Sequence, residues 1–480
     1  MPFFDPETLA EWSEGEWNRS PRNLISGFSH DSRRMESGGM FVAVRAERDG
    51  HDFIRDAARL GASSAMVDHF VAESDLPQLK TTDVCEAFLR IAQMHRSNFE
   101  GKIVGVTGSC GKTSTKDALK LLLGPDTCLA TNGNFNNLLG VPLTLLRLEH
   151  SLHRQAVVEA GINQIGEMAK LAKTIAPDIA LVTMVASAHL EGLGSEKMVA
   201  QEKARLIQDS TTVKTAIFPE HCLKFDAFRE VQKSEAKSLV LKYGDPTEEP
   251  PKGFLFFDTK TETNRVGDAA SLRLRRRGYP PLLLPIPLVS EGMVSNFALA
   301  VTAALELGVS EDEIFERLPQ YKPSALRGKW LQGRGNFYYV DCYNANPASM
   351  LDAIRFFQRQ AGNLPKLLTL GGMEELGDEG PLLHHETGSR ITMGPSDKVL
   401  LVGEKAEWMK AGILKSGIER ESIELLKNFN NKNKINLSAP VPVFDIIEFL
   451  GYDIDFRKDG IYQDTDILGG TLIEDKTVQI

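Results

Sequence analysis

The sequence contains few cysteines, and none of them follows a pattern of disulfides or metal ligands. The cysteines are odd in number and scattered, and no two form a C-x-x-C pair; they are Cys85, Cys110, Cys128, Cys222 and Cys342. This usage argues against a disulfide framework and a cysteine-ligated zinc site, and it is typical of reduced thiols. Cys110 lies in a glycine-rich turn, and we interpret it as a small side chain that the tight backbone of the turn tolerates.

A basic charge and a long apolar run are also missing. The 480 residues carry a net charge of −10, whereas a general nucleic-acid or acidic-membrane binder needs a basic field. No apolar run is long enough to cross a bilayer, and residues 1–7 lack the basic start and apolar core of a leader peptide. We therefore expect a cytoplasmic protein that binds no nucleic acid and does not insert into a membrane. With 42% hydrophobic residues the chain can form several cores, and its length predicts about three domains.

The strongest chemical signal is the stretch from Gly105 to Ser114. It follows an apolar strand-like run and precedes residues with helical spacing, so it predicts a strand, a glycine turn and a helix start. In such a turn the backbone N–H groups and the helix N-terminus face an anion, Lys112 reaches the outer phosphates and Thr113 holds Mg²⁺. The usual phosphate loop, G-x-x-x-x-G-K-[ST], fails here by one residue because Val106 stands at its first glycine. The turn predicts ATP or GTP binding, and an ordinary glycine turn before a helix is the alternative.

Three charged side chains follow in unexpected apolar contexts. Glu159 lies among apolar neighbours in the strand-like run 155–161, where an unpaired carboxylate is costly unless a metal ion near the phosphates compensates it. His189 follows the strand 179–185, at the carboxyl end where open α/β sheets bind ligands, although it could simply start a helix. Lys203 shares the apolar side of the helix 195–208 with Val199 and Leu206. Such a lysine usually extends its ammonium group to water, but here it is also a candidate for chemistry.

Polar loops accompany these groups. The turn 131–142 is rich in asparagine, which can bind a polar ligand or merely tolerate unusual backbone angles. Loops 29–33 and 45–53 place hydroxyl, guanidinium and imidazole groups beside strands, and alone such loops are usually solvated turns.

The pattern of apolar runs predicts three α/β domains. We expect a small N-terminal domain at 1–99, a central phosphate-loop domain with a parallel sheet at 100–327, and a C-terminal Rossmann-like domain at 328–480. Within the central domain, residues 240–290 read as an antiparallel addition to the main sheet, and Asn296 opens an Ala/Leu-rich helix that stops at Gly308. In the last domain we expect parallel strands at 337–340, 366–370 and 398–402, with Asn346 capping a helix that starts at Pro347.

Taken in order, these motifs resemble the Mur ligase family. The resemblance rests on residues 107–113, 133–137 with 140–146, 159–163 and 189–192, together with Lys203, Asn296, Arg327 and the run 343–346. The shifted phosphate loop is that family's form. The runs 133–146, 343–347 and 373–377, together with 31–33 and 49–53, resemble the branch that adds D-alanyl-D-alanine to UDP-N-acetylmuramoyl-tripeptide, so they imply an ATP-dependent, ADP-forming ligase of peptidoglycan precursor synthesis.

The resemblance also implies roles for single residues. The implied catalytic residues are Lys112, Glu159, His189 and Lys203. Two Mg²⁺ ions are implied, held by Thr113, Glu159, His189 and Lys203, with Lys203 carried as a carbamate. The implied nucleotide contacts are Gly108, Ser109, Gly111, Lys112, Thr113, Ser114, Asn296, Arg327, Tyr343, Asn344 and Asn346. The implied contacts to the UDP-sugar are Asp31, Ser32, Arg33, His51, Asn134, Asn136 and Asn137. The substrates are small molecules, and we expect a monomer.

The chain departs from the family at a few positions. Gly292 and Met293 stand where the family usually has histidine and asparagine, and Gly372 stands where it usually has aspartate. A Lys-Gly-Ser-Arg run near the end is absent, so no role is carried over to residues after about 425. The alternatives are another Mur-type or folylpolyglutamate-type ligase, and a phosphate-loop relative that binds nucleotide without ligation.

Overall fold

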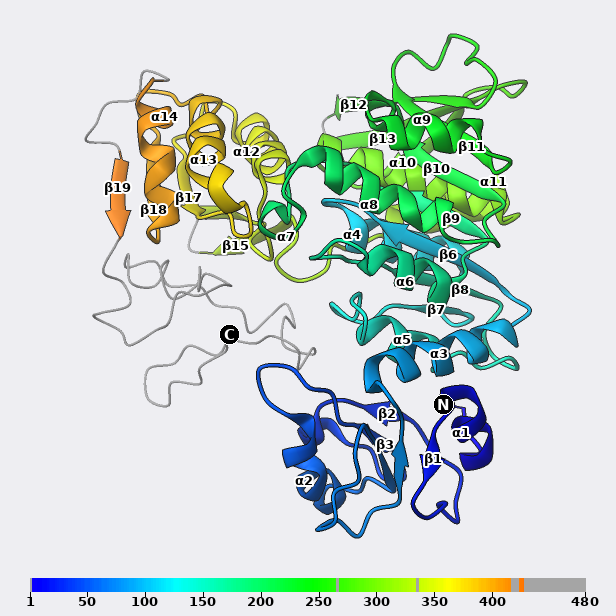
Figure 1. The fold of residues 1–480 in the computed structure, drawn as a ribbon. Coiled ribbons are helices and arrows are strands. Elements are labelled where there is room, and N and C mark those ends of the chain that lie inside the picture. The colour runs from blue at the N-terminus through cyan, green and yellow to red at the C-terminus, as the bar shows by residue number, and fades with distance from the viewer. Residues whose placement is uncertain (1, 265–266, 334–335, 416–422, 427–480) are drawn as a thin grey trace.

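The computed structural model describes residues 2–264, 267–333, 336–415 and 423–426. Its elements form an N-terminal unit (α1 to β5), a central unit (β6 to α11) and a C-terminal unit (β15 to β19), with helix α3 between the first two. In Figure 1 these units lie at the bottom, the upper right and the upper left. Each unit contains both helices and strands, which confirms the predicted α/β class.

The N-terminal unit is a five-stranded sheet in the order β1-β5-β4-β3-β2, in which only β1 runs antiparallel to its neighbour. Helix α2 ends just before Gly61, whose φ of 104° favours glycine. The elements are α1 (Pro6–Ser13), β1 (Glu16–Trp17), β2 (Phe28–Ser29), β3 (Met40–Val42), α2 (Ile54–Arg59), β4 (Ser64–Val67), β5 (Gln78–Lys80) and then α3 (Val84–Ser97).

The central unit is a nine-stranded sheet in the order β14-β13-β12-β11-β10-β9-β6-β8-β7. Strands β6 to β12 run parallel to one another, whereas β13 pairs antiparallel with both β12 and β14. The antiparallel addition predicted for residues 240–290 is therefore confirmed for β13 and β14, but β11 and β12, which overlap that range, pair in parallel. The strands are β6 (Lys102–Thr107), β7 (Cys128–Ala130), β8 (Gln155–Glu159), β9 (Ile179–Val182), β10 (Thr215–Pro219), β11 (Lys237–Tyr243), β12 (Phe254–Asn264), β13 (Gly267–Arg276) and β14 (Leu282–Ile286). The helices are α4 (Lys112–Leu123), α5 (Gly140–Leu145), α6 (Glu167–Ile175), α7 (Leu190–Leu193), α8 (Glu196–Gln208), α9 (Asp226–Lys233), α10 (Glu291–Glu306) and α11 (Glu311–Arg317).

Apolar side chains leave both faces of this sheet because successive residues of a strand point to opposite sides. On β6, Ile103 belongs to the core under α3, α5, α6, α8 and α9, whereas Val104 and Val106 belong to the core under α4, α10 and α11. Strand β6 is therefore buried on both faces, and the loop after it leaves the sheet in the middle of the unit.

Helix α3 joins the N-terminal and central units. Its buried Phe88 and Ile91 belong to one continuous core with Met40 of the N-terminal sheet and Leu171 of α6. Near its end, the buried Arg96 donates hydrogen bonds to the carbonyl oxygens of Ile175, Phe99 and Ala176 and to Asp178. One guanidinium group thus satisfies several carbonyl groups at the junction of α3 and α6.

We expect Arg96→Met to lower the free energy of unfolding by about 3–5 kcal/mol, because it leaves buried acceptors without a donor. The control is Lys102→Met. Lys102 donates to the same Asp178 at 2.8 Å but is half exposed, and its loss should cost under about 1 kcal/mol. Urea unfolding of both variants measures the difference. Equal effects of the two changes would contradict the conclusion that Arg96 stabilises the junction of α3 and α6.

The C-terminal unit holds a hairpin of β15 (Lys329–Gly333) and β16 (Asn336–Val340) and a parallel sheet in the order β17-β18-β19. The remaining elements are β17 (Leu367–Gly371), β18 (Lys398–Val402), β19 (Ile423–Leu426), α12 (Pro347–Ala361), α13 (Gly380–Ser389) and α14 (Lys410–Lys415). Our prediction that 337–340 belongs to the parallel sheet was wrong, because β16 pairs antiparallel with β15. Asn346 caps α12 and Pro347 begins it, as predicted.

Helix α10 starts earlier than we predicted. Ser290 is its N-cap and accepts a hydrogen bond from the N–H of Met293, so the helix includes Gly292 and Met293 and does not begin at Asn296. A serine before a Glu-Gly pair is a start signal that the Ala/Leu-rich pattern further along obscured.

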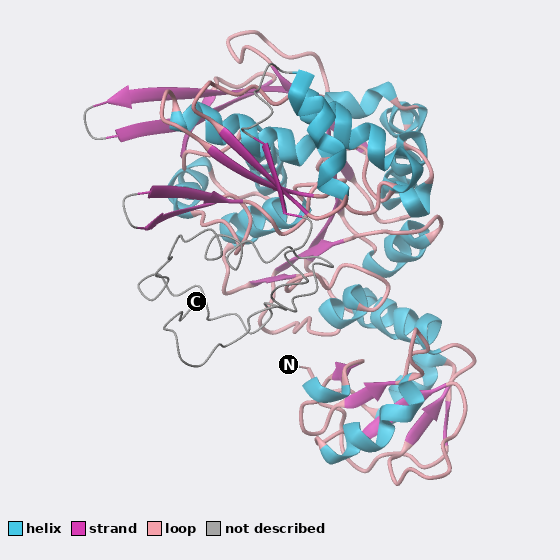
Figure 2. Ribbon diagram, turned by 90° about the vertical axis from the view of Figure 1, so that its left-hand side faces the viewer, coloured by secondary structure: helices cyan, strands magenta, loops and turns pink. Residues whose placement is uncertain are grey.

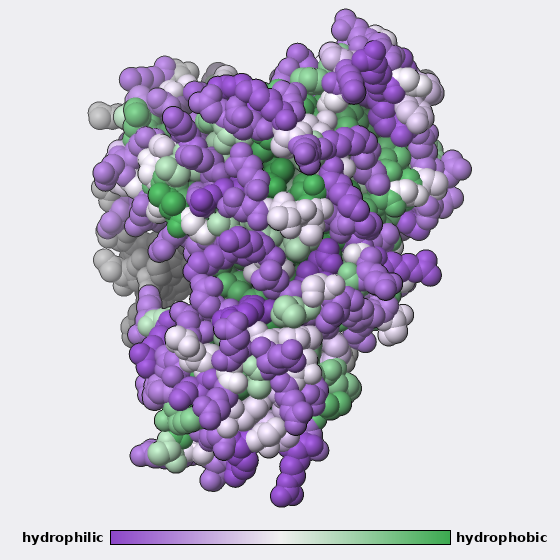
Figure 3. All heavy atoms as spheres, turned by 45° about the vertical axis from the view of Figure 1, so that its right-hand side comes forward, coloured by the Kyte–Doolittle hydropathy of each residue, from purple (hydrophilic) through white to green (hydrophobic). Residues whose placement is uncertain are grey.

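Two hairpins project from the surface of the molecule. Figure 2 shows β12–β13 and β15–β16 extending to the same side. On the face in Figure 3, apolar residues are scattered among hydrophilic ones. Among the described residues, no helix is both long and apolar enough to cross a membrane.

Candidate nucleotide and metal site

The loop after β6 has the backbone that a phosphate-binding turn requires. Gly111 has φ 81°, and a Cβ there would lie 2.4 Å from Asn296 Oδ1 of α10. A Cβ at Gly108 would lie 1.8 Å from Oγ1 of Thr183, the residue after β9, so this position also has no room for a side chain. Both glycines are therefore required by the packing of the loop, which explains them independently of any ligand.

Ser109 and Lys112 hold the loop in shape. The Ser109 N–H donates to Met184 O at 2.9 Å, and its hydroxyl donates to Ala186 O at 2.8 Å. Lys112 Nζ donates to Gly108 O at 2.8 Å, so the ammonium group lies over the loop at the start of α4. Burial lowers the pKa of Lys112, and nearby Glu159 opposes this shift. The cation therefore faces the concave side of the turn, where an anion would lie.

Glu159 lies at the end of β8, beside the first turn of α4. It is 1% exposed, and it accepts hydrogen bonds from Thr113 Oγ1 at 3.0 Å and from Asn136 Nδ2 at 2.8 Å. A hydroxyl and a carboxylate that meet beside a phosphate loop are oxygen ligands of the kind Mg²⁺ prefers, so the pair fits that ion. Asn136, predicted as a substrate contact, is engaged with this carboxylate, and its substrate role stays a prediction.

Lys203 is buried on α8 and lies near the same loop. Its side chain is 1% exposed, and among the described residues its ammonium group has no hydrogen-bond or ion-pair partner. Burial lowers the pKa of Lys203 far below its usual value, and the charge of Lys112 lowers it further. The predicted position on the apolar side of the helix is confirmed.

His189 meets the C-terminal unit. It caps α7 with a left-handed backbone, and its Nδ1 pairs with Glu375 Oε2. The Glu191 N–H donates to Glu375 O at 3.2 Å, and the hydrogen bond from His189 lowers the pKa of Glu375. The sequence did not predict Glu375 as a partner of His189, although the run 373–377 was among the motifs that resemble the family.

Residues at the start of the C-terminal unit lie beside the phosphate loop. The guanidinium carbon of Arg327 stacks 4.0 Å from the ring centre of Tyr343. The Asn346 side chain caps α12 and also forms a hydrogen bond with Cys110, whose pKa burial raises to about 11. Asn344 is exposed and its Oδ1 accepts only from the adjacent Ala345 N–H, at 2.8 Å. The structure thus brings Arg327 and Asn346 to the loop, with Tyr343 next to them.

The predicted substrate residues are spread over a wider area. Asp31 accepts from the backbone and side chain of Arg33, Ser32 is buried at the start of the same short turn, and all three lie in the N-terminal unit. Asn134 is exposed, and Asn137 Oδ1 accepts from Gly140 N–H at 2.8 Å at the start of α5. These residues are not in contact with the phosphate loop, and their roles stay predictions.

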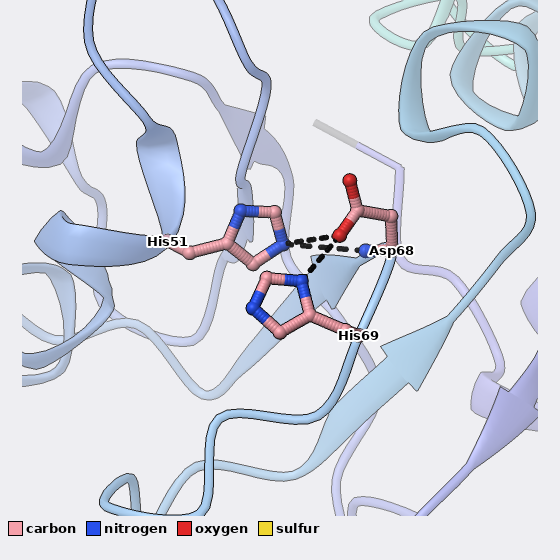
Figure 4. Close-up of side chains that lie close together, drawn as sticks. All are labelled: His51, Asp68 and His69. Carbon is pink, nitrogen blue, oxygen red and sulfur yellow. Dashed lines mark hydrogen bonds and ion pairs between the residues drawn. The ribbon is translucent and has the colours of Figure 1, made fainter.

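His51 belongs to a second polar cluster, shown in Figure 4. His51, Asp68 and His69 place three possible ligand atoms within 4.8 Å of one another, and the two rings stack at 4.3 Å. Asp49 orients His51 through Nδ1 at 2.6 Å. However, Arg45 already pairs with Asp68 at 2.9 Å. The charge of Arg45 neutralises the carboxylate and opposes binding of a cation. We therefore interpret the cluster as a set of side-chain contacts that hold the loop 45–53 against the end of β4.

A cavity of about 560 Å³ lies inside the C-terminal unit, between β16, α12 and β17. Asp341 and Tyr343 line its rim, but no residue of the phosphate loop takes part. The chemistry of the site therefore lies outside this cavity, at the junction of the central and C-terminal units.

Comparison with known proteins gives consistent matches along the chain. The Mur ligase middle domain matches residues 106–304, and the Mur ligase, glutamate ligase domain matches residues 326–434. The UDP-N-acetylmuramoyl-tripeptide–D-alanyl-D-alanine ligase of Escherichia coli K12 is 32% identical over 386 residues, which cover 80% of this chain and 82% of the relative.

Solved structures give the same result. A crystal structure of MurF from Acinetobacter baumannii superposes with a TM-score of 0.78 at 26% identity and covers 94% of each chain. The MurF ligase of Thermotoga maritima in complex with ADP superposes with a TM-score of 0.69 at 25% identity, covering 85% of this chain and 89% of that one.

Proposed function

This chain belongs to the Mur ligase family, and we propose that it joins D-alanyl-D-alanine to UDP-N-acetylmuramoyl-tripeptide with conversion of ATP to ADP and phosphate. The observation that carries the proposal is the buried Thr113–Glu159 pair beside a phosphate loop capped by Lys112. The likeness to D-alanyl-D-alanine ligases over four fifths of the chain supports the choice of substrates.

The reaction brings two anions into contact, the peptide carboxylate and the triphosphate of ATP. The terminal carboxylate of the peptide attacks the γ-phosphorus of ATP, an O–P bond forms, and ADP leaves with the electrons of the broken P–O bond. Lys112 and the loop N–H groups bind the phosphate oxygens, and Arg327 is placed to neutralise the transferred group. Next, the amine of D-alanyl-D-alanine attacks the acyl carbon, loses a proton and displaces phosphate.

We assign Thr113 and Glu159 as ligands of one Mg²⁺ and His189 with Lys203 as ligands of a second. Bound Mg²⁺ would supply positive charge that offsets the negative charge of the phosphates. Lys203 suits addition of CO₂, because burial lowers the pKa of its amine and because the carbamate anion would be attracted by Lys112, which repels an ammonium group at this place. Asn296, Tyr343, Asn344 and Asn346 contact the nucleotide in this proposal.

The remaining assignments complete the proposal. The domains divide near 99 and 327, which is supported by the separate sheets on either side. The N-terminal residues Asp31, Ser32, Arg33 and His51, with Asn134, Asn136 and Asn137, bind the UDP-sugar. In this proposal the protein acts in the cytoplasm as a monomer.

We expect the purified protein to release ADP only when both ATP and UDP-N-acetylmuramoyl-tripeptide are present, and to form the amide only when D-alanyl-D-alanine is added. Coupled ADP assays and mass spectrometry of the product measure the two steps. A folate-type acceptor or a different amino acid serves as the control substrate. Nucleotide binding without peptide-dependent ADP release would instead indicate an inactive relative.

A further inference from the structure

Gly292 and Asp352 form a contact between the central and C-terminal units. The Gly292 N–H, in the first turn of α10, donates to both carboxylate oxygens of Asp352 on α12, at 3.1 and 3.2 Å. The Ser290 side chain adds a hydrogen bond to the same carboxylate. Burial raises the pKa of Asp352, and the hydrogen bonds from Ser290 and Gly292 oppose this shift, as does the helix N-terminus, which favours a negative charge.

The contact explains why position 292 lacks a side chain. A Cβ at Gly292 would lie 2.6 Å from Asp352 Oδ2. The family usually has histidine here, so the carboxylate of Asp352 occupies the place that a side chain would take. Sequence reasoning noted the glycine as a departure, and the structure supplies its partner from a different unit.

The contact also fixes how α12 meets the phosphate loop. Asn346, at the start of α12, forms its hydrogen bond with Cys110, and Asp352, further along the same helix, is bound to α10. Helix α10 in turn carries Asn296, which lies against Gly111. Two contacts on one helix therefore set both the position and the direction of α12 over the nucleotide site.

From this geometry we propose that Asp352 is a positioning residue, which binds the N-terminus of α10 through Gly292 and thereby holds Tyr343 to Asn346 against the phosphate loop for ATP binding. This inference rests on the proposed function, because its first test measures KM for ATP in the ligase reaction. Asp352 itself need not touch the nucleotide.

A double-mutant cycle tests the proposal. We expect Asp352→Ala to raise KM for ATP about tenfold, since it removes a hydrogen bond to a charged group between the units. Gly292→Ala should raise KM by a similar factor because its Cβ displaces the carboxylate. The double variant should be no worse than the worse single one, whereas independent effects would multiply.

The controls separate positioning from unfolding. Alanine is a better helix former than glycine, so Gly292→Ala should keep or raise the melting temperature while KM rises. Arg359→Gln removes the exposed pair with Glu291 at 3.1 Å and the weaker pull of this charge on Asp352, but it keeps both hydrogen bonds from Gly292, so it should leave KM within about twofold. Multiplying effects, or an unchanged KM in Asp352→Ala, would overturn the proposal.

The two hypotheses fail in different ways. Wild-type protein without peptide-dependent ADP release would disprove the proposed ligase function. The positioning role is then still measured by calorimetric binding of a non-hydrolysable ATP analogue to the same variants, with the same coupling expected in Kd. An active wild type without coupling disproves only the positioning role.

Discussion

Replacement of Lys112 by alanine is expected to lower ligase turnover about a hundredfold to a thousandfold, the effect of removing one preorganised charge-stabilising donor. The ammonium group lies over the phosphate loop and is satisfied only by Gly108 O in the described structure. A bound triphosphate would take over that donor. Steady-state ADP release with peptide and D-alanyl-D-alanine measures the loss.

The fold should survive this change. Lys112 lies at the start of α4 and contributes no apolar contact to the core, so we expect the free energy of unfolding to fall by about 1 kcal/mol, the value of one hydrogen bond. Lys120→Ala removes the same charge two turns further along α4 and should leave turnover near wild type. Near wild-type turnover in Lys112→Ala would contradict the assignment.

Local patterns predicted the elements that position the site. The run 103–106 with its glycine turn predicted β6 and the start of α4, and the apolar spacing over 195–208 predicted α8. These signals lie within a few residues of one another, so the sequence alone carries them. The burial of Glu159 and Lys203 followed from their apolar neighbours in the same way.

The partners of these residues could not be predicted, because they come from distant segments. Glu375 meets His189 and Asp352 meets Gly292 only after the C-terminal unit packs on the central one. Likewise, β16 pairs with β15 in an antiparallel hairpin and not with the parallel sheet, and the residues of β16 alone do not indicate which of the two pairings forms. The hydrogen bond from Asn136 to Glu159 forms only when the turn 131–142 folds against β8, and the substrate role of Asn136 stays a prediction.

The second large effect concerns Lys203. We expect Lys203→Ala to cut formation of the acyl phosphate by at least about a hundredfold, comparable with the loss of a preorganised electrostatic group, while binding of an ATP analogue survives. The side chain is buried without a described partner and lies in the field of Lys112, so an ammonium group here would be costly and a carbamate would be stabilised. Carbon-13 NMR with labelled bicarbonate should show a carbamate signal in the wild type and none in the variant.

A matched pair of variants distinguishes the carbamate from a structural lysine. Lys203→Ala leaves space, so a short carboxylic acid such as acetate should enter it and restore part of the activity. Lys203→Met fills the same space with an apolar chain and should be equally inactive but not rescued. A lysine that served only packing would behave in the opposite way, since Lys203→Met would then preserve turnover and acetate would have no effect on either variant. Near-normal turnover in Lys203→Ala would remove this residue from the site.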